Sequence, residues 1–271
     1  MLAFLENLGH ALHFAWRGLF VLPFSLRRLH SLHVQLHQIL LGALPLGVAA
    51  GVAIGAVVWL HLRGTLQTVG GPGAVQYLPQ ALALAVVLEF APLAAGLIVA
   101  GRSGASLGAE LGSMRLTEQI DALEVLGLSP LRELVAPRLL ACMLALPLLT
   151  LFIAYLALGA GYAAEALGGS LSWTQYRMEC LRVLTLSDAV PAVLKTVVFG
   201  YLIGVTGCWF GMNARGGTEG VGAAATRGVV VSIFLVLVSD VVLVKLIQVL
   251  REAWIDRVHL VLACCPLSSL L

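Results

Sequence analysis

The sequence predicts an all-α integral membrane protein with an N-terminal interfacial helix, five transmembrane helices and a short amphipathic helix on the cytoplasmic side. Of its 271 residues, 60% are hydrophobic and only 11% are charged, whereas a soluble domain carries about 25% charged residues. Five apolar runs are long enough to cross a bilayer, which takes about 20 residues. A polar, glycine-punctuated stretch, residues 101–130, separates the second run from the third.

Charge and cysteine content exclude several classes of function. The formal net charge is +2, and no Lys/Arg-rich run indicates nucleic-acid binding. The five cysteines include no C-x-x-C pair, and Cys142 and Cys208 lie in apolar runs. We therefore expect free thiols, with neither a disulfide framework nor a zinc site. Glu6 comes early and no basic region precedes a compact apolar core, so no cleavable signal peptide is expected.

Residues 1–38 are expected to form an interfacial amphipathic segment. Apolar side chains recur there at helical spacing, beside Trp16 and Arg17: Phe4, Leu8, Leu12, Ala15 and Leu19. This pattern is typical of a helix lying in the membrane surface. His30, His33 and His37 share a helical face. We expect that face to be wetted at the lipid headgroups, with metal binding as the alternative, and predict no metal site.

Residues 39–250 hold the five predicted spans. They are Ile39–Leu60, Ala74–Ala100, Leu139–Ala164, Ala189–Met212 and Val229–Leu250. Pro147 is expected to kink the third span. The odd number of spans places the two chain ends on opposite sides. Arginines are more numerous on the side that holds residues 101–138, which is therefore expected to be cytoplasmic. Residues 251–271 form a C-terminal tail.

Glycines recur four residues apart in several of these helices. The steps are Gly47–Gly51–Gly55, Gly104–Gly108–Gly112, Gly200–Gly204 and Gly207–Gly211. Positions without a side chain let two backbones approach closely. For any one pair, packing within the chain is the expected reason. Together they indicate a tightly packed bundle and a subunit interface, for which the first three glycines are candidates.

The polar stretch contains a predicted amphipathic helix over residues 114–127. At helical spacing, Leu116, Ile120, Leu123 and Leu126 lie on one side, and Glu118, Asp121 and Glu124 lie on the other. Thr117 is expected to cap the helix and Gly127 to end it, and Ser129-Pro130 opens the next helix. The acidic face is either solvated or a docking surface for a soluble partner, and the length and punctuation of the stretch favour docking.

Three ionisable residues lie at membrane depth. Glu89, Lys195 and Asp240 interrupt the second, fourth and fifth apolar runs. Such groups are costly in a bilayer unless they are paired or wetted. Their signs allow a Glu–Lys–Asp network inside the bundle. The alternative is that each reaches the interface by extending along its helix, most readily Lys195 and Lys245.

Two segments resemble the MlaE family of ABC-transporter permeases. AELGSMRLTEQIDALEVLGLSP, within residues 101–130, resembles the family signature, and MNARGGTEGVGAAATRGVVV, residues 212–231, resembles its second cytoplasmic loop. The match covers roughly residues 40–250. Glu89 with Phe90-Ala91-Pro92 resembles the family's Glu-x-x-Pro. Lys195, Arg227 and Asp240 match charged positions of the family, which implies a network of these four charges. One departure is Leu88, where the family often has Arg.

The resemblance implies a homodimeric permease subunit in the bacterial inner membrane. Its cargo would be a phospholipid, with sterols and other apolar lipids within the family's range. ATP and Mg would bind a separate ATP-binding subunit on the cytoplasmic face, and this chain would be neither an enzyme nor a cofactor protein. An MCE-domain protein would bind on the periplasmic face, and a small STAS-domain protein can bind the ATPase. Residues 114–127 would be the coupling helix, with five coupling residues: Arg115, Glu118, Asp121, Glu124 and Gly127.

Two other functions are considered beside the permease. A self-contained secondary transporter or channel would use Glu89, Lys195 and Asp240 as an ion relay, but neither the inverted repeat nor the broken spans of that class are visible. Gly101-Arg102-Ser103-Gly104 matches the G-x-S-G of intramembrane rhomboid proteases. That serine needs a histidine base, and no later span contains one.

The chain also lacks the phosphate-binding motif G-x-x-x-x-G-K-[ST], so ATP hydrolysis is expected to belong to another subunit.

Overall fold

The chain is helical throughout the residues that the computed structural model describes, which are 2–25, 29–168 and 171–264. Five helical segments of that part are long and apolar enough to cross a membrane, which confirms the predicted fold class. Each extends beyond its predicted run: Leu29–Gly70, Gly73–Leu116, Leu131–Gly168, Leu186–Met212 and Gly217–Ala253. Arg27, Arg28, Cys265 and the end of the predicted tail, residues 265–271, lie outside the described residues.

The helices follow one another in a simple order. The first span is α2 and the second is broken into several pieces; α7, α9 and α10 are the third, fourth and fifth. The bounds are α1 (Leu2–Ser25), α2 (Leu29–Gly70), η1 (Pro72–Tyr77), α3 (Leu78–Ala85), η2 (Val86–Phe90), α4 (Ala91–Val99), η3 (Ala100–Gly104), α5 (Ala105–Leu116), α6 (Gln119–Val125), η4 (Leu131–Val135), α7 (Ala136–Gly168), α8 (Trp173–Val183), α9 (Leu186–Met212) and α10 (Gly217–Cys264).

Two predicted boundaries do not coincide with breaks in the chain. The first span begins at Leu29, so the histidines predicted for the interfacial segment lie on the first turns of α2 and are exposed. The helix continues through residue 38 because nothing between Leu29 and Gly42 stops it. At the other end, α10 runs without a break through residue 250 to Cys264, so this part of the predicted tail is helical.

α7 lies at the centre of the bundle and packs against α2, α4 and α9. Three glycines of α2, Gly47, Gly51 and Gly55, face it. A Cβ built on Gly47 would lie 3.0 Å from Leu149, one on Gly51 would lie 2.9 Å from Leu156, and one on Gly55 would overlap the Ala157 carbonyl. These three positions therefore serve packing within the chain.

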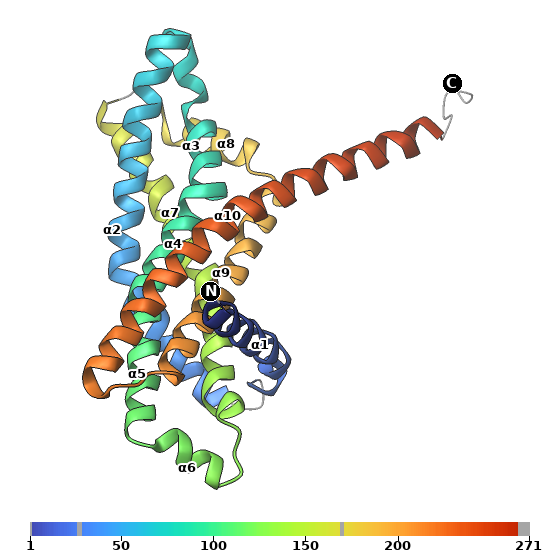
Figure 1. Ribbon diagram of the computed structural model, residues 1–271. Helices are drawn as coiled ribbons and strands as arrows, with labels where there is room; N and C mark the ends of the chain where they lie inside the picture. Colours follow the sequence, from blue (N-terminus) through green and yellow to red (C-terminus); the bar gives the residue numbers. More distant parts are fainter. Residues whose placement is uncertain (1, 26–28, 169–170, 265–271) are drawn as a thin grey trace.

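α1 lies across the bundle rather than along it (Figure 1). Phe14 and Ala15 face inward, where the Phe14 ring is 5.3 Å from that of Trp209 and the Tyr201 hydroxyl donates a hydrogen bond to the Ala15 carbonyl. Trp16 and Phe20 are exposed on a second, apolar side. A third side is polar and exposed, with Glu6, His10, His13 and Arg17. A helix with bundle-facing, apolar and polar sides suits the membrane interface.

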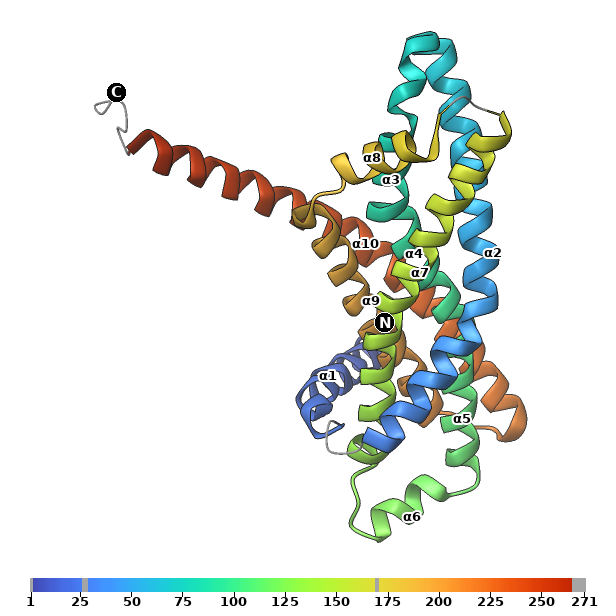
Figure 2. The ribbon, with the colours of Figure 1, turned by 180° about the vertical axis from the view of Figure 1, so that it is seen from behind.

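The two ends of the bundle differ in character. Figure 2 shows α6 at one end and α8, with the turn between α2 and α3, at the other. α8 begins with a capping box formed by Ser172 and Gln175. Its buried face is held by Tyr176, whose hydroxyl donates to the Leu158 carbonyl at 3.0 Å. The C-terminal half of α10 extends away from the bundle in both views.

Candidate functional site

Three charged side chains from different spans meet inside the bundle. Lys195 Nζ on α9 donates a hydrogen bond to Glu89 Oε2 at 2.8 Å and lies 3.0 Å from Asp240 Oδ1 on α10. Lys195 is only 3% exposed and Asp240 only 7%, whereas the Glu89 side chain is 41% exposed. Lys195 is thus buried between two carboxylates and does not reach the interface. The structure brings together Glu89, Lys195 and Asp240 as the sequence suggested.

A π-helical turn gives Glu89 its direction. Glu89 lies in η2, which is followed at once by α4 and its second residue, Pro92. Proline lacks an N–H, so the turn that precedes it has a carbonyl without its usual helical donor. Wider π turns occur mostly as single insertions in α-helices, often at functional sites. Here the π turn carries Glu89, which is the more exposed of the two carboxylates in the cluster.

Arg227, the fourth charge of the expected network, lies elsewhere. It is exposed on α10, 13 residues before Asp240. At about 1.5 Å per residue this places it about 20 Å away along the helix. No ion pair of Arg227 occurs within the described part of the chain. The intramembrane cluster therefore has one cation and two carboxylates.

An apolar cavity lies on the same half of the bundle as Glu89. It has a volume of about 500 Å³, and its walls come from the second half of α2 and from the second span. Ala85 directly precedes η2 and Phe90 is its last residue, so the cavity begins beside the turn that carries Glu89. No residue of α10 is among the lining residues. The remaining lining residues are Ala53, Ile54, Val57, Val58, His61 and Leu62.

The amphipathic helix predicted over residues 114–127 is shorter than expected. α5 continues the second span to Leu116, a turn follows, and α6 begins only at Gln119. Glu118 has a φ of 57°, in the left-handed region, which breaks the helix between the two. Thr117 does not cap α6, because its hydroxyl donates back to the Ser113 carbonyl at 3.0 Å.

The end of α6 is as predicted. Gly127 has a φ of 73°, and its N–H donates to the Glu124 carbonyl at 2.9 Å. The Leu128 N–H donates to the Leu123 carbonyl, also at 2.9 Å. These two bonds form a Schellman motif, which requires the left-handed conformation that glycine adopts without strain. α6 is therefore held between two defined turns.

α6 projects from the bundle and presents acidic side chains to solvent. Ile120 is its one buried residue, and Glu118 and Glu124 are exposed. Asp121 forms an ion pair with Arg115 at the end of α5, so part of the acidic face is used to hold α6 against the second span. Leu116 and Leu126, which were predicted to lie on the apolar side of this helix, are exposed.

One buried acidic residue was not anticipated from the sequence. Glu165 on α7 is completely buried, accepts a hydrogen bond from Trp59 Nε1 at 2.8 Å and pairs with Arg63 Nη1 at 3.1 Å. The predicted third span ends at residue 164, one residue before Glu165. The sequence held one indication of this contact, because Trp59 and Arg63 lie one helical turn apart on α2 and so share a face of that helix.

Another ion pair fastens the end of the bundle that carries α6. Arg138 Nη2 on α7 lies 3.2 Å from Glu110 Oε2 on α5, and its Nη1 donates to the Leu134 carbonyl at 2.9 Å. Arg138 is 7% exposed. Breaking a buried pair by removing one partner is strongly destabilising. This contact therefore ties α7 to the helix that leads into α6.

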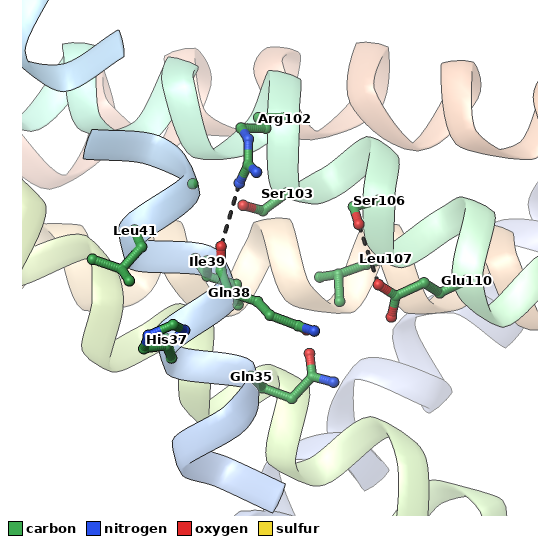
Figure 3. Close-up of a pocket in the computed structure, with 11 residues that line it drawn as sticks. Gln35, His37, Gln38, Ile39, Leu41, Arg102, Ser103, Ser106, Leu107 and Glu110 are labelled. Atoms are coloured by element: carbon green, nitrogen blue, oxygen red, sulfur yellow. Dashed lines mark hydrogen bonds between the residues drawn. The ribbon is translucent and has the colours of Figure 1, made fainter. Parts of the chain in front are cut away.

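A polar cavity of about 490 Å³ opens near that pair (Figure 3). It lies between the first turns of α2 and the η3–α5 segment. Ser103, the serine of the G-x-S-G sequence, lines it and is 2% exposed, and its hydroxyl has no hydrogen-bond partner among the described residues. His37 lines the same cavity but forms no hydrogen bond with Ser103. The serine–histidine contact that a protease needs is therefore absent from this part of the chain.

The three cysteines whose surroundings the structure describes contribute no reactive group. Cys142, Cys180 and Cys208 are free and buried. Cys180, on α8 outside the spans, donates a hydrogen bond to the Pro79 carbonyl at 3.5 Å. Burial raises the pKa of its thiol to about 11, and the charge of Glu179 adds to the rise. The thiol is therefore protonated at neutral pH and acts as packing.

These features define a class of protein. The chain is a multi-pass helical membrane protein with a buried charge cluster, a lateral apolar cavity and a short acidic helix projecting from its arginine-rich end. Comparison with known families identifies the class more closely. The model of the family described as Permease MlaE matches residues 32–246. The chain belongs to the MlaE permease family.

Relatives in bacteria and plants are similar over its central part. A probable ABC transporter permease protein of Rickettsia typhi is 37% identical over 164 residues, 60% of this chain and 63% of that protein. One of Synechocystis is 34% identical over 168 residues, 62% and 64% of the two chains. The chloroplast protein trigalactosyldiacylglycerol 1 of Arabidopsis thaliana is 38% identical over 162 residues, 60% and 46%. The matched region thus spans less than two thirds of each relative.

Proposed function

We propose that this chain is the permease subunit of an ABC transporter that moves a phospholipid or a related apolar lipid. The observation that supports it most is the pairing of a lateral apolar cavity with a projecting acidic helix in a chain of the MlaE family. Relatives named as probable ABC transporter permeases support the transporter class. The name of the Arabidopsis relative, which is that of a galactolipid, supports a lipid cargo.

α6 acts as the coupling helix in this proposal. Its exposed carboxylates, Glu118 and Glu124, dock on a separate ATP-binding subunit that holds ATP and Mg. The ion pair of Arg115 with Asp121 joins α6 to α5, and Glu110 with Arg138 joins α5 to α7. A movement of the docked subunit would therefore reach the second and third spans through two defined contacts. This chain itself carries out no catalysis.

The apolar cavity holds an acyl chain of the cargo. Its lining residues are apolar apart from His61, and transfer of each CH2 group from water is worth about 0.8 kcal/mol. Glu89 lies beside the cavity and is partly exposed, so it is the charge of the cluster that can meet a polar group of the lipid. Lys195 and Asp240 hold it in position.

The remaining subunits follow from the family. Two copies of the chain form the permease, an MCE-domain carrier binds the end that holds α8, and a STAS-domain protein can bind the ATPase. The membrane is the inner membrane of a bacterium. Exposed apolar residues along the outer half of α10, including Val241, Leu246 and Leu250, offer a surface for the second copy.

Lipid-stimulated ATP hydrolysis tests the proposal. The complex would be purified with its ATP-binding subunit and reconstituted in nanodiscs, and hydrolysis would be measured with and without added phospholipid. We expect hydrolysis to increase with lipid and to lose this response in a Val57→Arg variant, which places a charge in the apolar cavity. Hydrolysis that is indifferent to lipid, or no ATP-binding subunit in the complex, would overturn the proposal.

A secondary transporter is the second candidate, favoured by the formation of the Glu89–Lys195–Asp240 cluster. In that case the cluster would relay ions without ATP. Transport by the chain alone in liposomes, driven by an ion gradient and abolished by Asp240→Asn, would support it. Strict dependence on ATP would exclude it.

A further inference from the structure

We infer that the polar cavity between α2 and the η3–α5 segment binds the zwitterionic headgroup of a lipid of the cytoplasmic leaflet, with a phosphate at one end and a protonated amine at the other. The inference deepens the proposed lipid transport by naming a headgroup class and an entry position. Binding itself can be measured without transport.

The lining of the cavity is polar and carries both signs of charge. Seven polar side chains line it: Gln35, His37, Gln38, Arg102, Ser103, Ser106 and Glu110. Figure 3 shows Arg102 and Ser103 close together in the upper part of the picture and Glu110 to the right, beside Ser106, with the two glutamines below. A volume of about 490 Å³ lies in the range of small-molecule sites.

The end formed by Arg102 and Ser103 suits a phosphate. The guanidinium of Arg102 uses Nη1 to donate to the Gln38 carbonyl at 3.3 Å, which is a long bond and leaves other N–H groups available. Ser103 Oγ is buried and without a partner in the described chain. A buried hydroxyl is unfavourable until it finds one. Arginine is the residue that binds phosphate oxygens in a bidentate manner, and the hydroxyl supplies a third donor.

The end formed by Glu110 suits an amine. Its Oε2 is taken by Arg138, but Oε1 accepts only a 3.3 Å hydrogen bond from Ser106. The side chain is 42% exposed. A single anion would be repelled by this carboxylate, whereas a zwitterion places its ammonium beside Oε1. The separation of charges in the cavity therefore favours a phosphate–amine headgroup over a phosphate alone.

The surface above the cavity suits the acyl chains. Gly42, Leu46, Ala49 and Ala53 follow at intervals of four, three and four residues, so they share one face of α2. Leu46, Ala49 and Ala53 are exposed, and Ala53 lines the apolar cavity. From residue 42 to residue 53 the helix rises about 16 Å, about half of the ~30 Å hydrocarbon core. One lipid could thus place its headgroup in the polar cavity and a chain in the apolar one.

Gly42 offers a way to disturb the site without removing a charge. A Cβ at this position would overlap the guanidinium of Arg102, so the absence of a side chain lets Arg102 lie across α2. Gly42→Ala is expected to displace the guanidinium while the helix is kept. Gly64→Ala, on the same helix with open space around its Cβ, is the matched control. Ser103→Ala removes the unpartnered hydroxyl.

Native mass spectrometry of the full-length protein in detergent tests the inference. The probes are dioleoyl-phosphatidylethanolamine, dioleoyl-phosphatidylglycerol, dioleoylglycerol and free phosphoethanolamine. We expect the ethanolamine lipid to bind most tightly, and Gly42→Ala and Ser103→Ala each to weaken it about tenfold, the loss expected for a hydrogen bond to a charged group. Gly64→Ala should bind as the unaltered protein does.

Several results would overturn the inference. Dioleoylglycerol bound as tightly as the ethanolamine lipid, or full binding by Gly42→Ala and Ser103→Ala, would exclude a headgroup site here. Equal binding of phosphatidylglycerol would exclude the role given to Glu110, and tight binding of free phosphoethanolamine would point to a soluble ligand. The proposed function is judged separately. Lipid-stimulated ATP hydrolysis can be absent while the ethanolamine lipid still binds, and hydrolysis can respond to lipid while the ethanolamine lipid does not bind at this site.

Discussion

At the scale of single residues, the bundle brings together the charges that lie within its apolar spans. Lys195 lies between Glu89 and Asp240, which come from two other spans. A charged group inside a membrane is tolerated when it is paired with another. The cluster also leaves Glu89 partly exposed next to an apolar cavity, so the ion pair with Lys195 holds a carboxylate beside that cavity.

Removing the central cation should destabilise the protein. Lys195→Met leaves two carboxylates without their partner, and loss of one member of a buried pair costs about 3 kcal/mol. We expect a clear fall in the thermal unfolding midpoint in detergent, partly restored by Asp240→Asn in the same chain. Lys245→Met is the matched control, since Lys245 is exposed. Equal midpoints for the two methionine variants would contradict a buried, paired Lys195.

At the scale of helices, close packing and defined breaks set the positions of the sites. α2 lies against α7 through Gly47, Gly51 and Gly55, and the second span changes direction through the π turns η2 and η3. The first turn carries Glu89, and the second carries Arg102 and Ser103. Both cavities therefore lie where the second span departs from regular α-helix.

Gly55 is the tightest point of the contact between α2 and α7. Gly55→Ala would place a methyl group on the Ala157 carbonyl, and overpacking typically costs 1–3 kcal/mol. We expect a loss of about 2 kcal/mol in unfolding free energy, measured by denaturation in detergent. Gly64→Ala should be neutral or slightly stabilising, because alanine favours a helix more than glycine does. A neutral Gly55→Ala would mean that α2 is not seated on α7.

α8 can be probed through the titration of Cys180. Burial raises the pKa of this thiol to about 11, above the value of about 8.5 for a free thiol, and the thiolate is the reactive form. Alkylation of Cys180 by iodoacetamide, followed by peptide mass spectrometry, should therefore rise with a midpoint near pH 11. Because the pKa is raised by folding, the neutral thiol contributes stability at neutral pH, and this contribution is lost as the pH rises from about 9 to 11. Rapid alkylation at pH 8 would show that α8 is not docked.

At the scale of the whole molecule, hydropathy predicted more of the fold than of the site. The five spans and the cluster of Glu89, Lys195 and Asp240 were predictable because long apolar runs and isolated charges are local features of a sequence. The Glu165–Arg63 pair was not, because its members are 102 residues apart and periodicity does not say which helices meet. The break before α6 depends on the backbone of Glu118, which no preference of glutamate indicates.

The account as a whole depends on α6 meeting a soluble subunit. The affinity-tagged chain would be expressed with its neighbouring genes, and the captured ATP-binding protein would be quantified for the unaltered chain and for Glu118→Lys/Glu124→Lys. These changes reverse two exposed charges and spare the Arg115–Asp121 pair. Glu6→Lys/Glu252→Lys, at exposed positions away from α6, changes the net charge equally.

We predict that the unaltered chain and the Glu6→Lys/Glu252→Lys control capture the ATP-binding subunit in similar amounts. The α6 variant should capture far less of it while keeping its elution volume and thermal midpoint. Capture that is equal in all three proteins would contradict coupling through α6, and capture of no ATP-binding subunit by any of them would contradict the ABC transporter itself.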